Sequence, residues 1–262
     1  MELGLKGKRA LVMGASKGLG RSIADALARD GASVVISGRH QASLDVAVAE
    51  LLALGATSAF GIPADVADNA QMDRLADGAV AAMGGVDILI LNHGGPPPGT
   101  ALDLKEADLA PWFQRMVAAP IHITQRLLPA MRAQKFGRII NVGSTGMLQP
   151  IPNLVMSNVM RAAVLGYLKT LSAEVAGDGV TVNVVAPGAI RTDRTLETAA
   201  SQAAKTGKTI DEVVAERSKT IPALRYGTPD EYGPLVAFLC GEPAAYITGS
   251  ILRADGGMVR GF

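Results

Sequence analysis

The stretch Gly14-Ala15-Ser16-Lys17-Gly18-Leu19-Gly20 decides the fold of this chain. It follows an apolar run at residues 10–13, which is typical of a buried strand, and it leads into a helical pattern at residues 19–29. Glycines permit a tight turn and a close backbone approach to a ligand, and a helix N-terminus offers free N–H groups and partial positive charge. The stretch therefore predicts a pyrophosphate site, and the alternative is an ordinary loop.

Short apolar runs alternate with helical patterns along the rest of the chain. Strands are predicted at residues 10–13, 33–37, 86–91, 138–142 and 180–185, and helices at 19–29, 42–54, 69–83, 154–175 and 229–239. Nearly continuous apolar strands are typical of a parallel sheet that is covered on both faces. We therefore expect the α/β class: a single doubly wound Rossmann domain over residues 1–262, with about seven parallel strands and helices on both faces.

The longest stretch without a clear pattern lies at about residues 188–207 and is rich in Thr, Ala and Ser. It follows the end of a predicted strand, where long loops often form lids or binding segments. We expect an irregular substrate loop inserted at about residues 188–220. Residues 196–220 contain no aromatic side chain, which argues against a substrate site built on ring stacking.

Composition excludes several classes of protein. The 262 residues carry a net charge of +1, which gives no electrostatic reason to expect nucleic acid or an acidic membrane surface as partner. Hydrophobic residues make up 48% and charged residues 19%, enough apolar side chain for a substantial core. The single cysteine, Cys240, excludes an internal disulfide, and the charged start lacks the apolar run of a signal peptide. We expect a cytoplasmic protein.

No metal site is expected from the sequence. The three histidines, His40, His93 and His122, lack the spacing of ligands, and one cysteine cannot build a metal cluster.

Several motifs in order resemble those of one family. They are Asn92-His93-Gly94-Gly95, Asn141-Val142-Gly143-Ser144, the stretch from Asn183 to Thr192, Thr248-Gly249 and Asp255-Gly256-Gly257. Together with the glycine turn, whose spacing is Gly-x3-Gly-x-Gly, they resemble the short-chain dehydrogenases/reductases from about residue 6 to 257. The resemblance implies an enzyme that reduces a carbonyl or oxidises an alcohol with a nicotinamide dinucleotide, of the kind that includes the 3-oxoacyl-[acyl-carrier-protein] reductases.

The glycine turn and the resemblance together give a predicted cofactor site. Asp65 and Val66 are expected to line the adenine pocket, and Asn92 is expected to flank the ribose. The complete predicted set is Gly14, Ser16, Lys17, Gly18, Leu19, Gly20, Arg39, Asp65, Val66, Asn92, Gly94, Arg161, Pro187, Gly188, Ile190 and Thr192.

The end of the second predicted strand favours NADP(H) over NAD(H). A carboxylate there would bind the 2′-hydroxyl of NAD, whereas an arginine accommodates the 2′-phosphate of NADP. The sequence reads Ser37-Gly38-Arg39-His40, with no acid, and Lys17 can reach the same region. The alternative is that Arg39 and Lys17 are merely solvated surface charges.

The catalytic positions depart from the pattern that the resemblance implies. Family members use a tyrosine as proton donor, a lysine four residues later, a serine that orients the substrate and an asparagine on the preceding helix. Ser144 fits the serine, but Ser157 falls at the tyrosine and Arg161 at the lysine, and no asparagine lies between Asn92 and Asn141. Arg161 can hold ribose hydroxyls but cannot act as a base, and Ser157 is a far poorer acid than a phenol.

His93 is a further candidate for proton transfer because it follows the fourth predicted strand and has an ordinary pKa near 6.5. The alternative is a loop histidine bonded to the backbone. The predicted catalytic residues are therefore Ser144, Ser157, Arg161 and His93. The stiff Gly94-Gly95-Pro96-Pro97-Pro98-Gly99 loop is expected to form a wall of the substrate site, or else a surface turn.

Three functions remain open from the sequence. The first is an NADP(H)-dependent oxidoreductase with an atypical site, acting on a small carbonyl or hydroxyl compound. The second is a non-redox lyase, dehydratase or isomerase of the same fold, and the third is an inactive protein that binds NADP(H) or a metabolite. The resemblance also implies a homo-oligomer, a tetramer or a dimer, that packs through the helices around residues 107–131 and 154–175.

Overall fold

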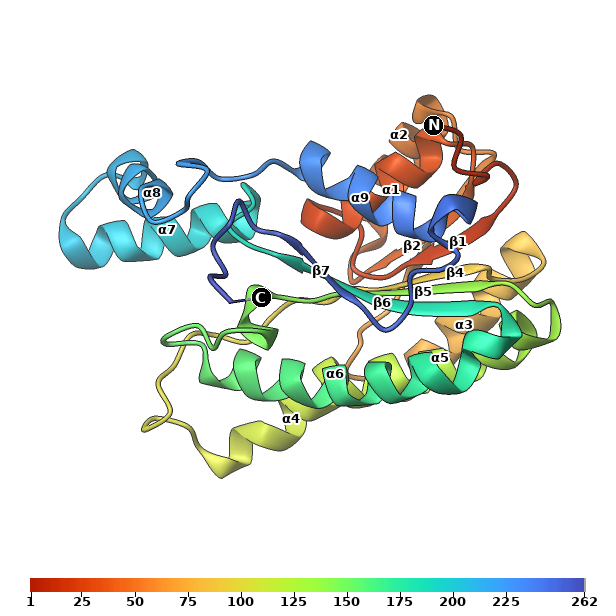
Figure 1. Ribbon diagram of the computed structural model, residues 1–262. Coiled ribbons are helices and arrows are strands. Elements are labelled where there is room, and N and C mark those ends of the chain that lie inside the picture. The colour runs from red at the N-terminus through yellow and green to blue at the C-terminus, as the bar shows by residue number, and fades with distance from the viewer. Residues whose placement is uncertain (262) are drawn as a thin grey trace.

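Seven parallel strands form one sheet in the order β3-β2-β1-β4-β5-β6-β7 in the computed structural model, which describes residues 1–261 (Figure 1). The strands are β1 (Arg9–Val12), β2 (Ser33–Gly38), β3 (Ser58–Pro63), β4 (Ile88–Leu91), β5 (Gly137–Val142), β6 (Val180–Pro187) and β7 (Ile251–Ala254). The predicted α/β fold class, a doubly wound parallel sheet of about seven strands, is confirmed.

Helices cover both faces of the sheet. One layer contains α1 (Gly18–Arg29), α2 (Gln41–Leu54) and α9 (Pro229–Cys240); the other contains α3 (Asn69–Met83), α4 (Leu109–Phe113), α5 (Ala119–Ala133) and α6 (Val155–Val175) (Figure 1). A π-helical turn, η2 (Gln114–Ala118), joins α4 to α5. Four 3-10 turns, at Glu106–Asp108, Thr145–Met147, Ala176–Asp178 and Glu242–Ala244, complete the regular structure.

The core is divided by the sheet into two layers, as strand geometry requires. In β1, Ala10 and Val12 pack against α1 and α9, whereas Leu11 packs on the side of α3 and α5. Successive side chains of a strand point to opposite faces, so a sheet buried on both faces needs apolar residues at every position.

The segment predicted to be irregular is helical, so that expectation is wrong. Residues 193–206 form α7 (Asp193–Thr206) and residues 210–218 form α8 (Ile210–Ser218), a pair that projects from the body of the molecule (Figure 1). Thr192 begins α7 with a capping box that Thr195 completes, and Gly207 ends it with a φ of +70°. The capping box and the glycine stabilise the two ends of α7. The Thr-rich and Ser-rich composition of this segment did not favour a helix.

None of the helices within residues 1–261 is long and apolar enough to cross a membrane.

Candidate active site

The glycine turn is held in shape by contacts that exclude side chains. An ideal Cβ on Gly20 would lie 2.4 Å from the Gly14 carbonyl oxygen and 2.6 Å from Nδ2 of Asn92, so only glycine fits there. Asn92 Nδ2 donates to the carbonyl oxygens of Met13 (3.1 Å) and Gly14 (2.9 Å). Asn92 thereby ties the end of β4 to the turn after β1.

The turn fits a pyrophosphate. α1 begins at Gly18, and its N-cap residue, Lys17, makes no side-chain capping bond, so the first N–H groups of the helix remain available. Gly18 has a φ of +65°, and a Cβ added to it would meet no atom within 4 Å, so this side of the turn is open. The turn lies between β1 and β4, where the strand order reverses and doubly wound folds bind dinucleotides.

The end of β2 provides the charge expected for a 2′-phosphate. Ser16 Oγ lies 3.4 Å from an ideal Cβ on Gly38, so the glycine turn and the end of β2 are in contact. Arg39 is exposed beside them. Lys17, by contrast, points towards α7, where its Nζ lies 3.2 Å from Asp193 Oδ2 in an exposed ion pair.

Six further predicted cofactor residues lie at the same edge of the sheet, at or after the carboxyl ends of β3 and β6, and Gly94 follows β4 at this edge. Asp65 Oδ1 accepts from the backbone N–H of Ala67 (2.9 Å), which fixes the turn that contains Val66. Gly188 packs so closely on Asp255 that an ideal Cβ would lie 2.7 Å from the Asp255 Cα. Pro187, Gly188, Ile190 and Thr192 follow in sequence from β6 to the start of α7.

Ser144, Ser157 and Arg161 are brought together between β5 and α6. Arg161 Nη1 donates to the Val142 carbonyl oxygen at the end of β5 (3.0 Å), and its Nε donates to Ser157 Oγ (3.2 Å). Ser144 Oγ accepts from the backbone N–H of Gly146 (3.1 Å). Each serine oxygen thus already accepts one hydrogen bond, and its O–H proton is available to a substrate oxygen.

Arg161 keeps its charge in this site. Burial lowers the pKa of its guanidinium to about 10, still far above neutral pH. Within residues 1–261, Arg161 forms no ion pair with a carboxylate. The charge is therefore available to a ligand.

His93 is a neutral imidazole here rather than a group poised near pH 6.5. Burial, followed by the positive charge of Arg161, lowers its pKa to about 4. Its Nδ1 lies 2.9 Å from the Gly94 carbonyl oxygen, which matches the alternative of a loop histidine bonded to the backbone. A catalytic role for His93 in proton transfer stays a prediction, and the lowered pKa argues against a role as an acid near neutral pH.

Two residues that contact segments bordering the site were not predicted from the sequence. Arg194, in the first turn of α7, donates from Nη2 to the Pro96 carbonyl oxygen (3.0 Å) and so joins α7 to the proline loop. Asn158 donates from Nδ2 to the Ile151 carbonyl oxygen (3.0 Å) and holds the segment before α6. A polar residue next to Ser157 was a visible signal for Asn158, whereas no local pattern distinguishes Arg194.

The tyrosine most deeply buried beneath the site is engaged elsewhere. Tyr232 on α9 is completely buried and donates its hydroxyl to the Val185 carbonyl oxygen (3.0 Å). Burial raises the pKa of this phenol above its ordinary value. Tyr232 is therefore a packing residue rather than a proton donor for the site.

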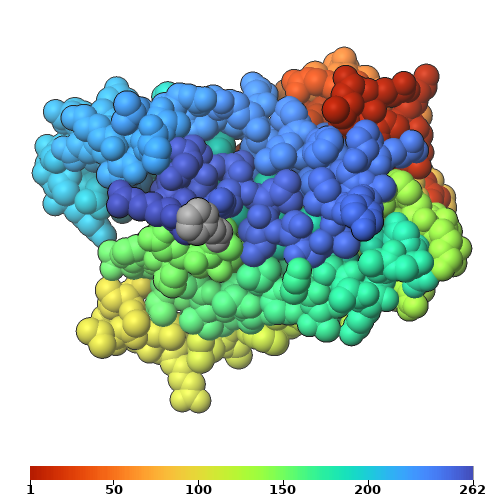
Figure 2. Space-filling model, in the orientation of Figure 1, coloured from red at the N-terminus to blue at the C-terminus, as the bar shows by residue number. Residues whose placement is uncertain are grey.

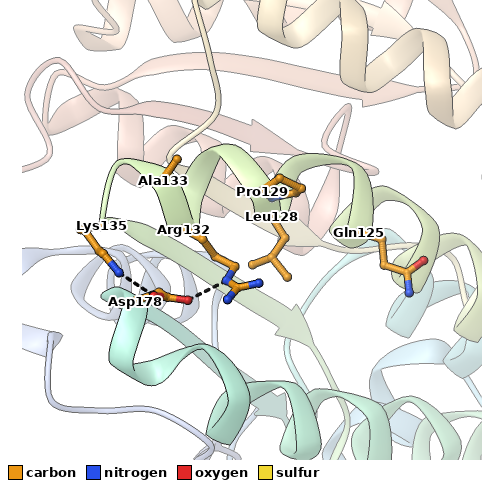
Figure 3. Close-up of a pocket in the computed structure, with 7 residues that line it drawn as sticks. All are labelled: Gln125, Leu128, Pro129, Arg132, Ala133, Lys135 and Asp178. Carbon is orange, nitrogen blue, oxygen red and sulfur yellow. Dashed lines mark hydrogen bonds and ion pairs between the residues drawn. The ribbon is translucent and has the colours of Figure 1, made fainter.

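A surface hollow elsewhere on the molecule has no catalytic character. It is lined by the C-terminal half of α5 and by Asp178, and Arg132 and Lys135 both bond to the carboxylate of Asp178, each at 2.6 Å (Figure 3). This end of α5 precedes β5, so the hollow lies at the amino edge of the sheet, opposite the glycine turn. Among residues 1–261, no three His, Cys, Asp or Glu residues are grouped to hold a metal ion.

Comparisons with known proteins match this chain to reductases over nearly its full length. A family model described as Enoyl-(Acyl carrier protein) reductase matches residues 14–259. The 3-oxoacyl-[acyl-carrier-protein] reductase FabG of Aquifex aeolicus (strain VF5) is 30% identical over 258 residues, covering 98% of this chain and 100% of the relative. Dehydrogenase/reductase SDR family member 4 of Sus scrofa is 36% identical, covering 97% and 88%.

Solved structures extend the similarity to the complete fold. L-sorbose reductase from Gluconobacter frateurii, complexed with NADPH and L-sorbose, has a TM-score of 0.95 at 30% identity and covers 100% of both chains. YwfH, an NADPH-dependent reductase involved in bacilysin biosynthesis, has a TM-score of 0.92 at 31% identity and covers 97% of this chain and 100% of its own.

Proposed function

This chain belongs to the short-chain dehydrogenase/reductase family of oxidoreductases, and we propose that it reduces the carbonyl group of a small molecule with NADPH, without a phenolic proton donor. The observation that carries the proposal is the arrangement of Ser144, Ser157 and Arg161 at the end of β5. Two free hydroxyl protons and one unpaired cation suit a carbonyl oxygen that gains negative charge.

NADPH is the proposed cofactor because the glycine turn and the end of β2 fit its phosphates. The N–H groups at the start of α1 would hold the pyrophosphate, and Ser16 and Arg39 would hold the 2′-phosphate. When bound, the cofactor supplies a hydride to the carbonyl carbon. Two similar proteins support this choice: L-sorbose reductase is described in complex with NADPH, and YwfH is described as an NADPH-dependent reductase.

The protein's residues stabilise the oxygen rather than protonate it. Ser144 and Ser157 donate hydrogen bonds to the substrate oxygen, and the Arg161 charge favours its negative form. The proton that completes the alcohol comes from water, because neither an aliphatic hydroxyl nor a guanidinium is an effective acid near pH 7. The His93 imidazole, with a pKa of about 4, is also unprotonated there.

We propose a carbonyl compound as the substrate of this reaction. The 3-oxoacyl thioesters are one candidate, because FabG of Aquifex aeolicus is a 3-oxoacyl-[acyl-carrier-protein] reductase. Sugars with a keto group are another, because L-sorbose reductase is described with L-sorbose.

The proposal is tested by following NADPH oxidation with a panel of ketones, keto sugars, oxo acids and 3-oxoacyl thioesters. We expect turnover of at least one class, and a decrease in kcat of about 100- to 1,000-fold in Ser144→Ala, the range found when one donor to a developing oxyanion is removed. Ser201→Ala, at an exposed position on α7, is the matched control. NADPH should also bind more tightly than NADH in a direct titration.

Other outcomes would select one of the alternative functions. Tight NADPH binding without oxidation across the whole panel would contradict the reductase and favour a binding protein. Consumption of a compound without NADPH oxidation would favour a non-redox enzyme that uses the same three residues to stabilise an oxyanion.

A further inference from the structure

Three positively charged or basic side chains from separate elements lie near enough for their charges to interact, and one of them contacts the proline loop. Arg161 comes from α6, Arg194 from α7 and His93 from the segment after β4. Arg194 Nη2 bonds to the Pro96 carbonyl oxygen (3.0 Å) and lies 3.1 Å from an ideal Cβ on Gly95. The guanidinium of Arg194 therefore lies directly over the Gly95–Pro96 wall.

The charges of this cluster affect one another. Burial, then the charge of Arg161, and then, more weakly, the charge of Arg194 lower the pKa of His93 to about 4. The Arg194 charge also helps burial to lower the pKa of Arg161 to about 10. The two guanidinium groups thus disfavour further positive charge in the same small region.

No carboxylate of residues 1–261 forms an ion pair with either arginine. The one acid beside Arg194 in sequence, Asp193, pairs instead with Lys17 of the glycine turn (3.2 Å). Two adjacent residues of α7 therefore face different partners: Asp193 faces the phosphate-binding turn, and Arg194 faces the proline loop. This division places Arg194 on the substrate side rather than on the pyrophosphate side.

A half-buried cation without a counter-ion is unfavourable unless a ligand supplies the negative charge. Arg161 is such a cation, and the exposed Arg194 lies on the open side of the same region. Arg194 uses one of its five N–H donors on Pro96, and Arg161 uses two, so several donors remain. A planar guanidinium matches a carboxylate by two parallel hydrogen bonds.

We infer that the substrate is an oxo acid, a carbonyl compound with a free carboxylate, and that Arg194 binds this carboxylate while the nearby charge of Arg161 also favours it. The inference rests on the proposed reductase function and adds its substrate class. In the reaction the C=O becomes CH–OH by gaining one hydride from NADPH and one proton from water, and the carboxylate is unchanged. Arg194 is then the residue that determines specificity for anionic substrates.

The test compares oxo acids with their neutral methyl esters: acetoacetate with methyl acetoacetate, and 4-oxopentanoate with methyl 4-oxopentanoate. We expect the wild type to favour the acids in kcat/KM, and Arg194→Gln to raise KM for the acids about 10- to 100-fold, the range for a lost hydrogen-bonded charge pair. KM for the esters and the Kd for NADPH should change less than about threefold. Arg191→Gln, an exposed neighbour without an ion pair, is the matched control.

Three results would overturn the inference. They are equal kcat/KM for acids and esters in the wild type, an equal rise in KM for both in Arg194→Gln, and a loss of NADPH affinity as large as the loss of acid affinity. A phosphorylated ketone, dihydroxyacetone phosphate, that was preferred over both acids in an Arg194-dependent manner would also overturn the carboxylate assignment.

The two proposals fail in different ways. Calorimetric titration of the NADP⁺-loaded protein with acetoacetate measures recognition of the carboxylate without turnover. Binding of acetoacetate that depends on Arg194, with no NADPH oxidation on any substrate, would contradict the reductase function. The same result would support a carboxylate site at Arg194. Rapid oxidation of NADPH with neutral ketones, without binding of acetoacetate, would support the reductase and contradict the carboxylate site.

Discussion

At the scale of the residue, position 157 separates this site from the pattern that its family resemblance implies. The sequence alone predicted that Ser144, Ser157 and Arg161 act together, and the hydrogen bonds around Val142 and Gly146 are consistent with a shared site. The sequence could not predict Arg194, because its contact with Pro96 depends on where α7 lies relative to a loop almost 100 residues earlier. Spacing in the sequence shows which side chains lie next to each other on one face of a helix. It does not show which segments far apart in the sequence come into contact.

Restoring a phenol at position 157 tests whether only the proton donor is absent. We expect the double variant Ser157→Tyr, Arg161→Lys to raise kcat with a neutral ketone by about 100-fold, the lower end of what a positioned general acid contributes. The double variant Ser157→Phe, Arg161→Lys has nearly the same size without the hydroxyl and serves as control. Equal rates in the two double variants would show that the site does not use a phenol at this position.

His93 should make stability depend on pH. Its pKa is lowered from 6.5 to about 4 in the folded state, so as pH falls below 6.5 the unfolded chain takes up a proton that the folded chain does not. The folded state is therefore destabilised between about pH 6.5 and 4, by about 1–3 kcal/mol given ~1.4 kcal/mol per pKa unit and partial solvent screening.

Urea unfolding of the wild type and His93→Gln at pH 7 and pH 4.5 measures this effect. The free energy of unfolding of the wild type should fall more than that of the variant over this interval. His40→Gln, an exposed histidine, should behave as the wild type. A parallel fall in wild type and His93→Gln would show that His93 titrates normally.

At the scale of the element, five of the long helices and the central strands were predictable from local patterns, whereas α5, α7 and the edge strands were not. The helix predicted at residues 69–83 is α3, whose N-cap, Asp68, accepts from the backbone N–H groups of Ala70 and Gln71. β3 and β7 were not predicted individually because they are the edge strands, where partial exposure removes the continuous apolar run. α7 was missed because its start depends on a threonine capping box rather than on an apolar pattern.

The first turn of α7 should influence cofactor affinity through the Lys17–Asp193 pair. Because the pair is exposed, it contributes little to stability, but Asp193 places negative charge beside the glycine turn that we propose binds the pyrophosphate. We expect Asp193→Asn to lower the Kd for NADPH about two- to fivefold at low salt, an effect of up to ~1 kcal/mol, and to have little effect at 0.5 M salt. Fluorescence titration at both ionic strengths measures this.

Glu197→Gln, on the same helix and without an ion pair, is the control for that change. A weaker affinity in Asp193→Asn, or a gain that persists at high salt, would mean that Asp193 acts by supporting α7 and not by its charge.

At the scale of the whole molecule, the outer face of α6 is the feature that remains without a partner within one chain. Ala162, Ala163, Gly166 and Ala173 are exposed along it, and Val159 is 43% exposed. Small side chains allow close approach of a second helix, which fits the homo-oligomer that the resemblance implies. In Figure 2 the green α6 forms part of the broad lower surface of the molecule.

We predict a homo-oligomer that packs through this face, and we expect Ala163→Arg to reduce it to a smaller species, since a charged side chain in the middle of the face cannot be buried without a partner. Size-exclusion chromatography with light scattering measures the mass. Ala49→Arg, on the exposed face of α2, is the control and should leave the mass unchanged. An unchanged mass for Ala163→Arg would remove α6 from the interface.

The strand order also has a consequence for the way in which the chain folds. β1 pairs with β2 on one side and with β4 on the other, so the first of the seven strands to be synthesised lies in the interior of the finished sheet. Every strand pairing is parallel, so none can form as a local hairpin. Each pair can form only after the crossover segment between its two strands has been synthesised. A ribosome-bound chain that ends before residue 88 lacks one neighbour of β1, and its apolar edge stays open to aggregation or to chaperones until β4 emerges.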